Sequence, residues 1–280
     1  MEALPYIQKY RGQIFVIKYG GSAMEDEAVV AGMLKDIVFL EAVGINPVLI
    51  HGGGKAITHR MADAGVTARF VNGLRVTDAI SIGIVQNVLD EVINPAIVRQ
   101  IQASGGRAAG IPGKDVFRAR KMAPQRDASG ETVDLGFVGE VVDVALQQVQ
   151  YILEQESIPV ISPLARGGEG EYLNVNADIA AGTIAGALGA AKMIYLSDVP
   201  GLMRDPSDAS TLFSSVNQEE IEALVATGVI SGGMLPKVHS ALNALRRGVQ
   251  KVHFMDGRVP RAILQEVFTD KGLGTEIVRV

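Results

Sequence analysis

Short, mainly apolar runs separated by amphipathic stretches are the feature that most limits how this chain can fold. The runs occupy residues 14–17, 47–50, 158–162, 193–196 and 251–255, and each lies close to a glycine or proline. Strands that are apolar at successive positions are buried on both faces, as in parallel sheets. Between the first two runs, apolar residues recur at helical spacing over residues 26–43, and Gly44 follows. The pattern predicts an α/β fold on a mainly parallel sheet.

The same alternation continues along the chain. A helix is predicted over residues 56–64, and another where apolar residues from Val238 to Leu245 share one face before Gly248. Residues 105–139 are dense in glycine, proline and charge, which predicts a hairpin-rich excursion with residues 137–142 as an exposed or edge strand. No proline- or serine-rich linker divides the chain, so any two halves are expected to share one continuous sheet.

Composition narrows the chemistry. Lys plus Arg number 26 against 31 Asp plus Glu, and the net charge of −5 offers no general attraction to nucleic acid or anionic lipid. There is no cysteine, which removes thiol nucleophiles, disulfides and thiolate metal sites. Residues 1–13 lack the order of a secretory signal, and the most apolar long stretch, residues 180–191, is shorter than the ~20 residues of a membrane helix. We therefore expect a cytoplasmic protein that acts on small molecules.

Two predicted strands end in glycine-rich loops. Lys18 with Gly20 and Gly21 follows the first strand, and His51 with the three glycines of residues 52–54 follows the second. In open α/β sheets, ligands bind beyond the carboxyl ends of strands, where glycine lets backbone N–H groups approach a phosphate. Neither loop is a Walker loop or a dinucleotide fingerprint. The structural alternatives are tight turns with positive φ and, for His51, a packed hydrogen-bonded residue, which is commoner than a general base.

Two further cations suit an anionic ligand or an ordinary surface role. Lys237 follows Pro236 in the first turn of a predicted helix, where a cation opposes the helix dipole by roughly 0.3–1 kcal/mol. It indicates either a bound anion or a solvated lysine. Arg75 lies in a loop between two helical stretches and either binds a carboxylate through its guanidinium or pairs with Asp78 at the surface.

The stretch from Asn174 to Asp178 precedes an alanine-rich helix. Two compatible roles are open to Asp178: capping this helix, which is worth ~1 kcal/mol, and orienting lysines with its carboxylate. The amides of Asn174 and Asn176 are candidate hydrogen-bond donors to a substrate.

Together, these cations and glycine loops predict a site for several anionic groups and point to phosphoryl transfer. The chain carries no histidine cluster, H-E-x-x-H motif or paired-acid motif for hydrolysis. An acceptor carboxylate, with an ordinary pKa of ~4.3, is ionised at pH 7 and needs no general base. Mg²⁺ would be held mainly by the nucleotide phosphates and water, so no carboxylate cage is required.

In this order, the motifs resemble those of the amino acid kinase superfamily and, within it, the arginine-sensitive, hexameric acetylglutamate kinases. The matching segments are KYGG at residues 18–21, HGGG at 51–54, GLRVT at 73–77, NVNAD at 174–178, LSDVPG at 196–201 and GMLPK at 233–237. The resemblance covers nearly the whole chain. It implies a three-layer α/β/α sandwich with a central, mainly parallel sheet. It also implies the reaction of ATP with N-acetyl-L-glutamate to give N-acetyl-L-glutamyl 5-phosphate and ADP, the second step of arginine biosynthesis.

The resemblance further implies a division of labour along the chain. Residues 1–188 would form an N-terminal acetylglutamate-binding and oligomerisation domain, and residues 189–280 a C-terminal nucleotide-binding domain. Lys18 and Lys237 would stabilise the transferring phosphoryl group, and Asp178 would hold the two lysines in place. Catalysis would rest on positioning and charge stabilisation, with no covalent intermediate and no metal ligand from the protein.

Two binding sets follow from the same resemblance. The acetylglutamate-binding set is Gly53, Gly54, Arg75, Asn174 and Asn176. The nucleotide-binding set is Gly20, Gly21, Ser197, Asp198, Gly201, Met203 and Gly233. Backbone N–H groups of Gly21 and Gly54 would bond the phosphates.

Residues 3–12 resemble the helix with which arginine-inhibited members interlace dimers into a hexameric ring, a trimer of dimers. The positions linked to arginine binding there are matched by Tyr10, His253, Glu266 and Gly274. The resemblance thus implies arginine as a feedback inhibitor and leaves open whether a regulatory protein docks on the ring. Lys55 departs from the proline or uncharged residue of many relatives, which bears on the acetylglutamate pocket. Arg261 departs from the histidine of several relatives, which bears on inhibitor affinity.

Two alternatives stay open. A sibling kinase could act on an acetylated or carrier-linked aminoadipate, because one extra methylene changes binding by only ~1–3 kcal/mol. A non-catalytic nucleotide or arginine sensor is the other, although a sensor has no need to keep Lys18, Lys237 and Asp178 together.

Overall fold

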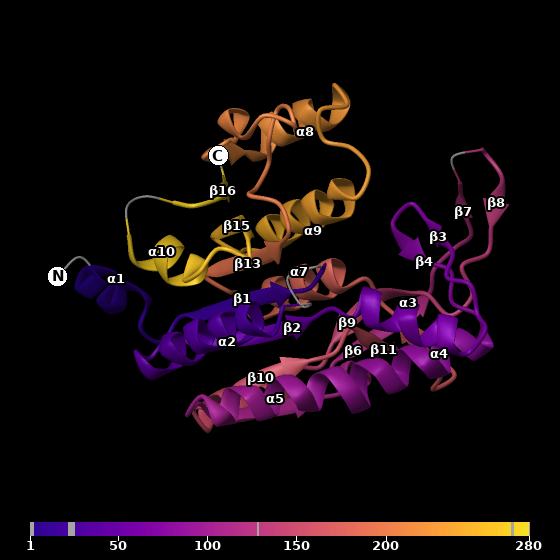
Figure 1. Ribbon diagram of the computed structural model, residues 1–280, viewed down its shortest axis with the longest axis horizontal. Helices are drawn as coiled ribbons and strands as arrows, with labels where there is room; N and C mark the ends of the chain where they lie inside the picture. Colours follow the sequence, from indigo (N-terminus) through magenta and orange to yellow (C-terminus); the bar gives the residue numbers. More distant parts are fainter. Residues whose placement is uncertain (1–2, 22–25, 128, 270–271, 280) are drawn as a thin grey trace.

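The computed structural model describes residues 3–21, 26–127, 129–269 and 272–279. Its centre is an eight-stranded sheet in the order β14-β16-β15-β13-β1-β2-β10-β5 (Figure 1). These strands are β14 (Ser215–Asn217), β16 (Thr275–Val278), β15 (Lys251–Asp256), β13 (Lys192–Ser197), β1 (Ile14–Tyr19), β2 (Asn46–His51), β10 (Ile158–Ile161) and β5 (Ala108–Ile111). All neighbours from β15 to β5 pair in parallel. Strand β16 is antiparallel to β15 and pairs in parallel with β14. The predicted mainly parallel, continuous sheet is confirmed.

The five apolar runs of the sequence became β1, β2, β10, β13 and β15 because helices bury both faces of the sheet. Alternate residues of β1 enter opposite layers: Phe15 and Ile17 pack in one apolar cluster and Val16 in the other, all three fully buried. One layer contains α1 (Ala3–Tyr10), α2 (Glu27–Ala42), α5 (Asn94–Ala103) and α10 (Ala262–Phe268). The other contains α6 (Gln147–Glu154), α7 (Ala177–Ala187), α8 (Gln218–Ala226) and α9 (Met234–Arg246). The predicted three-layer sandwich is therefore confirmed.

Smaller elements extend the half of the molecule that carries β2 and β10. Helices α3 (Gly54–Asp63) and α4 (Ala79–Gln86) are followed by a π-helical segment, η2 (Asn87–Ile93), which runs into α5. A four-stranded sheet has the order β12 (Tyr172–Asn174), β11 (Leu164–Arg166), β6 (Phe117–Lys121) and β9 (Gly139–Val144). The hairpins β3 (Phe70–Val71)–β4 (Leu74–Arg75) and β7 (Gln125–Arg126)–β8 (Thr132–Val133) lie side by side (Figure 1), joined by a 3.0 Å bond from Asn72 Nδ2 to the Arg126 carbonyl. Two short 3₁₀ turns are η3 (Gly113–Asp115) and η4 (Ala209–Thr211).

The excursion over residues 105–139 was predicted only in part. It contains the β7–β8 hairpin and strand β6, but β5 belongs to the main sheet as an edge strand. The sequence Ala-Ala-Gly-Ile of β5 is too short and too weakly apolar to stand out. The edge strand expected over residues 137–142 is β9, which starts later because Phe137 N–H bonds the Thr77 carbonyl and Val138 pairs with Asn174 instead.

None of the helices within the described ranges is both long enough and apolar enough to cross a membrane.

Candidate active site

Three charged side chains meet at the carboxyl-terminal end of β1. The Lys18 Nζ lies 2.9 Å from Asp178 Oδ1, and the Lys237 Nζ lies 3.4 Å from Asp178 Oδ2. The Lys18 and Asp178 side chains are each 8% exposed, whereas that of Lys237 is 22% exposed. Burial raises the pKa of the Asp178 carboxyl, but the two lysines outweigh burial and lower that pKa below its ordinary value. The carboxylate is thus ionised and keeps two ammonium groups together.

The helix that carries Asp178 is capped by another residue. Asn176 Oδ1 accepts from the N–H groups of Asp178 (2.8 Å) and Ile179 (3.3 Å), so Asn176 is the N-cap of α7. The prediction of Asp178 as the cap is therefore wrong, because the cap position falls two residues earlier. This places Asp178 in the first turn with its carboxylate free to bind lysines.

Lys237 lies in the first turn of α9, one residue after Pro236. Gly233 precedes this helix and offers no side chain to its N-terminal N–H groups. The alternative of a solvated lysine is wrong, because Asp178 on α7 holds the ammonium group.

The two glycine loops touch each other beside this triad. Tyr19 pairs with His51 across β1 and β2, and Gly52 N–H bonds the Tyr19 carbonyl at 2.7 Å. A Cβ on Gly20 would lie 2.9 Å from Lys18 Nζ, and a Cβ on Gly52 would lie 3.3 Å from Gly20 Cα. Glycine is therefore needed here for close approach rather than for positive φ. Gly21, with φ of +80°, does use that freedom.

A cavity of about 620 Å³ opens between these loops, α3, β4 and the start of α7. Its walls include Lys18, Gly21, Gly52, Gly53, Gly54, Lys55, Arg75, Asn174, Asn176 and Asp178. The structure thus gathers the whole predicted acetylglutamate-binding set with Lys18 and Asp178. Lys55 is exposed at this cavity and adds a cation to it. Asp178 is the only acidic residue among the described residues that line the cavity.

Arg75 is buried and directed by neutral acceptors. Its guanidinium donates to the Gly54 carbonyl (2.7 Å), Thr58 Oγ1 (2.8 Å) and Met61 Sδ (3.2 Å). Burial lowers the pKa of Arg75. The predicted alternative, an ion pair with Asp78, is wrong, because Asp78 caps α4.

Arg75 also differs from the predicted loop in its surroundings. It belongs to the short strand β4, and its guanidinium carbon lies 4.6 Å from the ring centroid of Phe70 on β3. Within the described residues, no carboxylate lies at ion-pair distance from the Arg75 guanidinium.

Asn174 is held by Thr77, a residue whose role the sequence did not reveal. Asn174 Nδ2 donates to Thr77 Oγ1 at 3.2 Å, and Thr77 Oγ1 donates to the Arg75 carbonyl at 2.8 Å. Thr58 and Thr77 thus connect Arg75 and Asn174 at one wall of the cavity. Thr77 ends the GLRVT motif and Thr58 follows the HGGG motif, but threonine hydroxyls are too common in sequences to be singled out.

The predicted nucleotide residues lie outside this cavity, except Gly21. Ser197 ends β13 beside β1, and Gly233 lies at the start of α9 near Lys237. Gly201 has an additional packing role, since a Cβ there would lie 2.5 Å from Thr275 Oγ1. Met203 forms an isolated bridge with Leu212 in the same loop. Their nucleotide-binding roles stay predictions.

Three of the four residues matched to arginine binding, Tyr10, His253 and Glu266, lie around Lys192, a lysine that was not predicted from the sequence. His253 Nδ1 lies 2.7 Å from Glu266 Oε1, and His253 Nε2 lies 3.0 Å from Lys192 Nζ. Lys192 Nζ also lies 5.3 Å from the ring centroid of Tyr10. Burial lowers the pKa of Lys192 to about 8. Lys192 escaped notice because it begins an apolar strand.

Gly274 completes this group through the backbone. A Cβ there would lie 2.0 Å from the Phe254 carbonyl, so only glycine fits, and the neighbouring Leu273 N–H bonds Glu266 Oε2 at 2.8 Å. Burial lowers the pKa of His253, with Lys192 adding to this and Glu266 opposing it.

His51 is a packed residue, as expected. It is fully buried, Nδ1 lies 3.0 Å from the Gly52 carbonyl, and Asn94 Nδ2 lies 3.2 Å from Nε2. Burial lowers the pKa of His51 to about 4.

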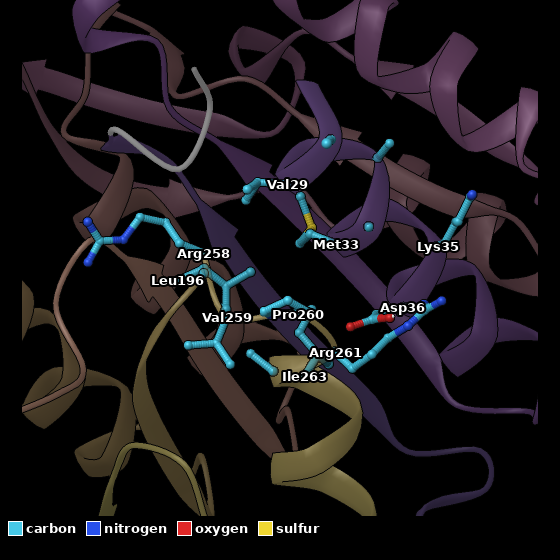
Figure 2. Close-up of a pocket in the computed structure, with 15 residues that line it drawn as sticks. Val29, Met33, Lys35, Asp36, Leu196, Arg258, Val259, Pro260, Arg261 and Ile263 are labelled. Carbon is cyan, nitrogen blue, oxygen red and sulfur yellow. Dashed lines mark hydrogen bonds and ion pairs between the residues drawn. The ribbon is translucent and has the colours of Figure 1, made fainter. Parts of the chain in front are cut away.

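A second cavity, of about 500 Å³, lies between α2 and residues 257–263 and shares no lining residue with the first. Figure 2 shows Val29, Met33 and Leu196 around it, with the Arg261 guanidinium beside the Asp36 carboxylate. Arg261 Nη1 lies 2.7 Å from Asp36 Oδ1, and burial raises the pKa of that carboxyl despite the arginine. Arg261, which directly precedes α10, therefore forms an ion pair with Asp36 of α2.

No group of three or more histidine, aspartate or glutamate side chains in the described ranges could hold a metal ion. At the first cavity, both oxygens of Asp178 face lysines. The residues there do not form a magnesium site of their own.

Comparison with known proteins agrees with this geometry. The model of the amino acid kinase family matches residues 13–256. The chain is 50% identical over 278 residues to the acetylglutamate kinase of Akkermansia muciniphila, covering 99% of this chain and 93% of that protein. It is 49% identical over 282 residues to the acetylglutamate kinase of Pelotomaculum thermopropionicum, covering 99% and 96%.

Two solved structures of one further protein are also similar. One is N-acetylglutamate synthase from Neisseria gonorrhoeae complexed with coenzyme A and N-acetyl-glutamate, with a TM-score of 0.86 and 27% identity over 100% of this chain. The other is the same synthase complexed with coenzyme A and L-arginine, with a TM-score of 0.83 and 26% identity over 99% of this chain. This chain spans 62% and 64% of those chains, less than two thirds of the synthase.

Proposed function

The chain belongs to the amino acid kinase family, and we propose that it transfers the γ-phosphoryl group of ATP to the side-chain carboxylate of N-acetyl-L-glutamate. The products are N-acetyl-L-glutamyl 5-phosphate and ADP, in arginine biosynthesis. Two curated relatives at about half identity over nearly the full chain carry the name acetylglutamate kinase. The observation that carries the proposal is the Lys18–Asp178–Lys237 triad beside two touching glycine loops.

The triad suits a reaction in which negative charge moves between oxygens. A carboxylate oxygen of the acceptor attacks the γ-phosphorus, the bond between this phosphorus and the β,γ-bridging oxygen breaks, and ADP leaves with the bond electrons. No proton needs to be removed, because the acceptor is already ionised. Lys18 and Lys237 neutralise charge on the phosphoryl oxygens, while Asp178 fixes where the two ammonium groups stand.

Arg75 supports an acidic acceptor. It is only 6% exposed, and three of its five N–H groups are taken by neutral acceptors in the protein. A buried guanidinium without a carboxylate partner leaves positive charge uncompensated, which favours an anionic ligand in the cavity. No acceptor among the described residues takes the other two N–H groups of Arg75, so they are available to a substrate carboxylate, and Asn174 adds an amide.

Mg²⁺ enters only as the companion of the nucleotide. Since the cavity residues do not form a metal site, the ion would be held by ATP phosphates and water, where it supplies positive charge. The steps assigned to Lys18, Lys237 and Asp178 stand without it.

The substrate is tested by measuring ADP release with Mg-ATP and either N-acetylglutamate or N-acetyl-aminoadipate, with hydroxylamine to trap the acyl phosphate. We expect turnover with N-acetylglutamate and a raised KM for it in Arg75→Gln, because that variant loses charge at the acceptor. Preference for the longer acid would identify a sibling kinase. No turnover with either acid would leave a nucleotide or arginine sensor.

We further propose feedback inhibition by arginine at the group formed by Tyr10, His253, Glu266 and Gly274, in a hexamer to which α1 contributes. The support is the family resemblance, the proximity of these residues and the similarity to a synthase studied with L-arginine. Initial rates with increasing arginine and sedimentation velocity test it. Glu266→Gln should weaken inhibition without lowering kcat in the absence of arginine. Rates unchanged in saturating arginine, or a dimer as the largest species, would refute the respective part.

A further inference from the structure

A chain of buried hydrogen bonds connects helix α5 to the second glycine loop. Asn94, the first residue of α5, is 5% exposed and donates from Nδ2 to the Val160 carbonyl at 2.9 Å and toward His51 Nε2 at 3.2 Å. His51 Nδ1 lies 3.0 Å from the Gly52 carbonyl. Asn94 and His51 take no part in the phosphoryl-transfer steps assigned to Lys18, Lys237 and Asp178.

The contacts of Asn94 fix the proton on the His51 ring. Turning the Asn94 amide over would bring its oxygen against the Val160 carbonyl, so the nitrogen must face both Val160 and His51. His51 Nε2 is then an acceptor without a proton, and Nδ1 carries the hydrogen. The Gly52 carbonyl requires the same tautomer, because it can only accept. Full burial also keeps the ring neutral.

The bond to the Gly52 carbonyl also orients the next N–H group. Within one trans peptide, the carbonyl and the N–H point in opposite directions, and the described residues contain no cis peptide. A carbonyl held toward the buried His51 ring therefore directs the Gly53 N–H away from it, on the side of the cavity that residues 52–54 line.

The π-helical segment η2 packs against Gly53. A Cβ on Gly53 would lie 2.6 Å from Leu89 Cδ2 and 2.9 Å from Ile93 Cδ1, both in η2. The loop thus contacts the His51 ring through the Gly52 carbonyl and η2 at Gly53, and Asn94 follows η2 directly. Rotation of the Gly52–Gly53 peptide would break the bond to His51.

We propose that His51 and Asn94 are positioning residues that hold the Gly53 N–H toward the anionic group at the point of phosphoryl transfer. The inference rests on the proposed function. His51 is neither a base nor a ligand contact in this account. It works through its Nδ1–H and the Gly52 carbonyl.

The test compares two amide replacements of His51 in the full-length protein. His51→Asn places an N–H near the position of Nδ1 and can still bond the Gly52 carbonyl, whereas His51→Gln places its amide near Nε2 and cannot. We expect the Asn variant to keep kcat within about threefold and the Gln variant to lose about 10- to 100-fold, with KM for ATP little changed. Equal kcat values in the two variants would overturn the proposal. The exposed His239→Gln serves as the matched control.

Asn94→Asp gives a second, pH-dependent readout. In Asn94→Asp the bond to the Val160 carbonyl is lost, and a carboxylate oxygen faces Nε2. At low pH the pair formed by this carboxylate and His51 binds one more proton, which lies between the carboxylate and Nε2 and leaves Nδ1–H in place. At high pH the neutral ring shifts its one proton to Nε2, so Nδ1 repels the Gly52 carbonyl. We therefore expect kcat of Asn94→Asp to fall as pH rises, relative to wild type. Parallel pH profiles would contradict the proposal.

The tautomer itself can be read by ¹⁵N NMR of the wild-type histidines, with His51→Asn used for assignment. A protonated Nδ1 on His51 supports the proposal, and a protonated Nε2 overturns it. Failure of the proposed function is distinct: wild type would then release no ADP with N-acetylglutamate, whereas the positioning role fails when wild type turns over and the two His51 variants do not differ.

Discussion

At the scale of single residues, one buried carboxylate organises the cations of the site. Asp178 divides its two oxygens between Lys18 from β1 and Lys237 from α9. Two ammonium groups this close would repel each other without it, and Lys18 is nearly as buried as Asp178. The triad carries one net positive charge, and Arg75 adds a second among the residues that line the cavity.

Replacing Asp178 by asparagine should therefore cost both activity and stability. The variant keeps the shape but leaves Lys18 buried without a counter-charge, so we expect kcat to fall by at least about 10²-fold and the free energy of unfolding by about 3 kcal/mol. Steady-state kinetics and urea unfolding measure the two effects. The matched control is Asp63→Asn on the exposed face of α3, which should change neither. A fully active Asp178→Asn would refute the role of the carboxylate.

The lowered pKa of Lys192 leads to a prediction about how the free energy of unfolding depends on pH. Its pKa is about 8 in the folded chain, below the ordinary value of 10.5. Between these values the unfolded chain binds a proton that the folded chain has released, so stability from this group rises with pH in that interval and is flat below it. We expect the free energy of unfolding of wild type, relative to Lys192→Met, to increase on the order of 2 kcal/mol between about pH 7.5 and 9.5. A difference that stays constant with pH would show that the lysine keeps an ordinary pKa.

At the scale of elements, the contact between α7 and α9 determines where Lys237 stands. Ser240 Oγ on α9 donates to the Asp178 carbonyl at 2.6 Å and accepts from the Tyr195 hydroxyl at 2.8 Å. Gly182 on α7 makes room for this serine, since a Cβ there would lie 2.3 Å from Ser240 Oγ and 2.9 Å from its carbonyl oxygen.

Gly182→Ala should push α9 away from α7 and separate Lys237 from Asp178. We expect a loss of about 1–3 kcal/mol in the free energy of unfolding together with reduced kcat, measured by urea unfolding and ADP release. Gly83→Ala in α4 is the matched control, because a Cβ there meets nothing within 4 Å. That change should stabilise the chain by up to about 1 kcal/mol. Equal unfolding free energies and equal kcat values in Gly182→Ala and Gly83→Ala would show that the close contact between α7 and α9 matters for neither stability nor activity.

Some of the strands and helices could be predicted from the sequence, and others could not. Strands β1, β2 and β13 were found because burial on both faces leaves an unbroken apolar run. The segment η2 was not predicted, because the wider π-helical turn depends on what the helix packs against rather than on its own sequence. Asn94, placed by η2, was missed for the same reason.

At the scale of the whole molecule, the order of strands assembles the site. Strand β1 lies between β13 and β2, so the end of β1 lies beside both the loop that follows β13 at Ser197 and the second glycine loop. Residue types and spacing predicted Lys18, Lys237 and Arg75 as cations of one anionic-ligand site, and the family resemblance assigned Asp178 to the two lysines. Thr58 and Thr77, which contact Arg75 and Asn174, and Lys192, which contacts His253, depend on tertiary contacts that no local sequence pattern predicts.

The role of the Lys18–Asp178–Lys237 triad in phosphoryl transfer is tested most directly by the rate of ADP release with Mg-ATP and N-acetylglutamate, measured for wild type and Lys237→Ala. We expect turnover by wild type and a fall in kcat of about 10²- to 10³-fold in Lys237→Ala. KM for N-acetylglutamate should stay nearly unchanged, because Lys237 acts on the transferring phosphoryl group. Wild-type kcat in Lys237→Ala, or the loss appearing in KM alone, would contradict the role of the triad in phosphoryl transfer.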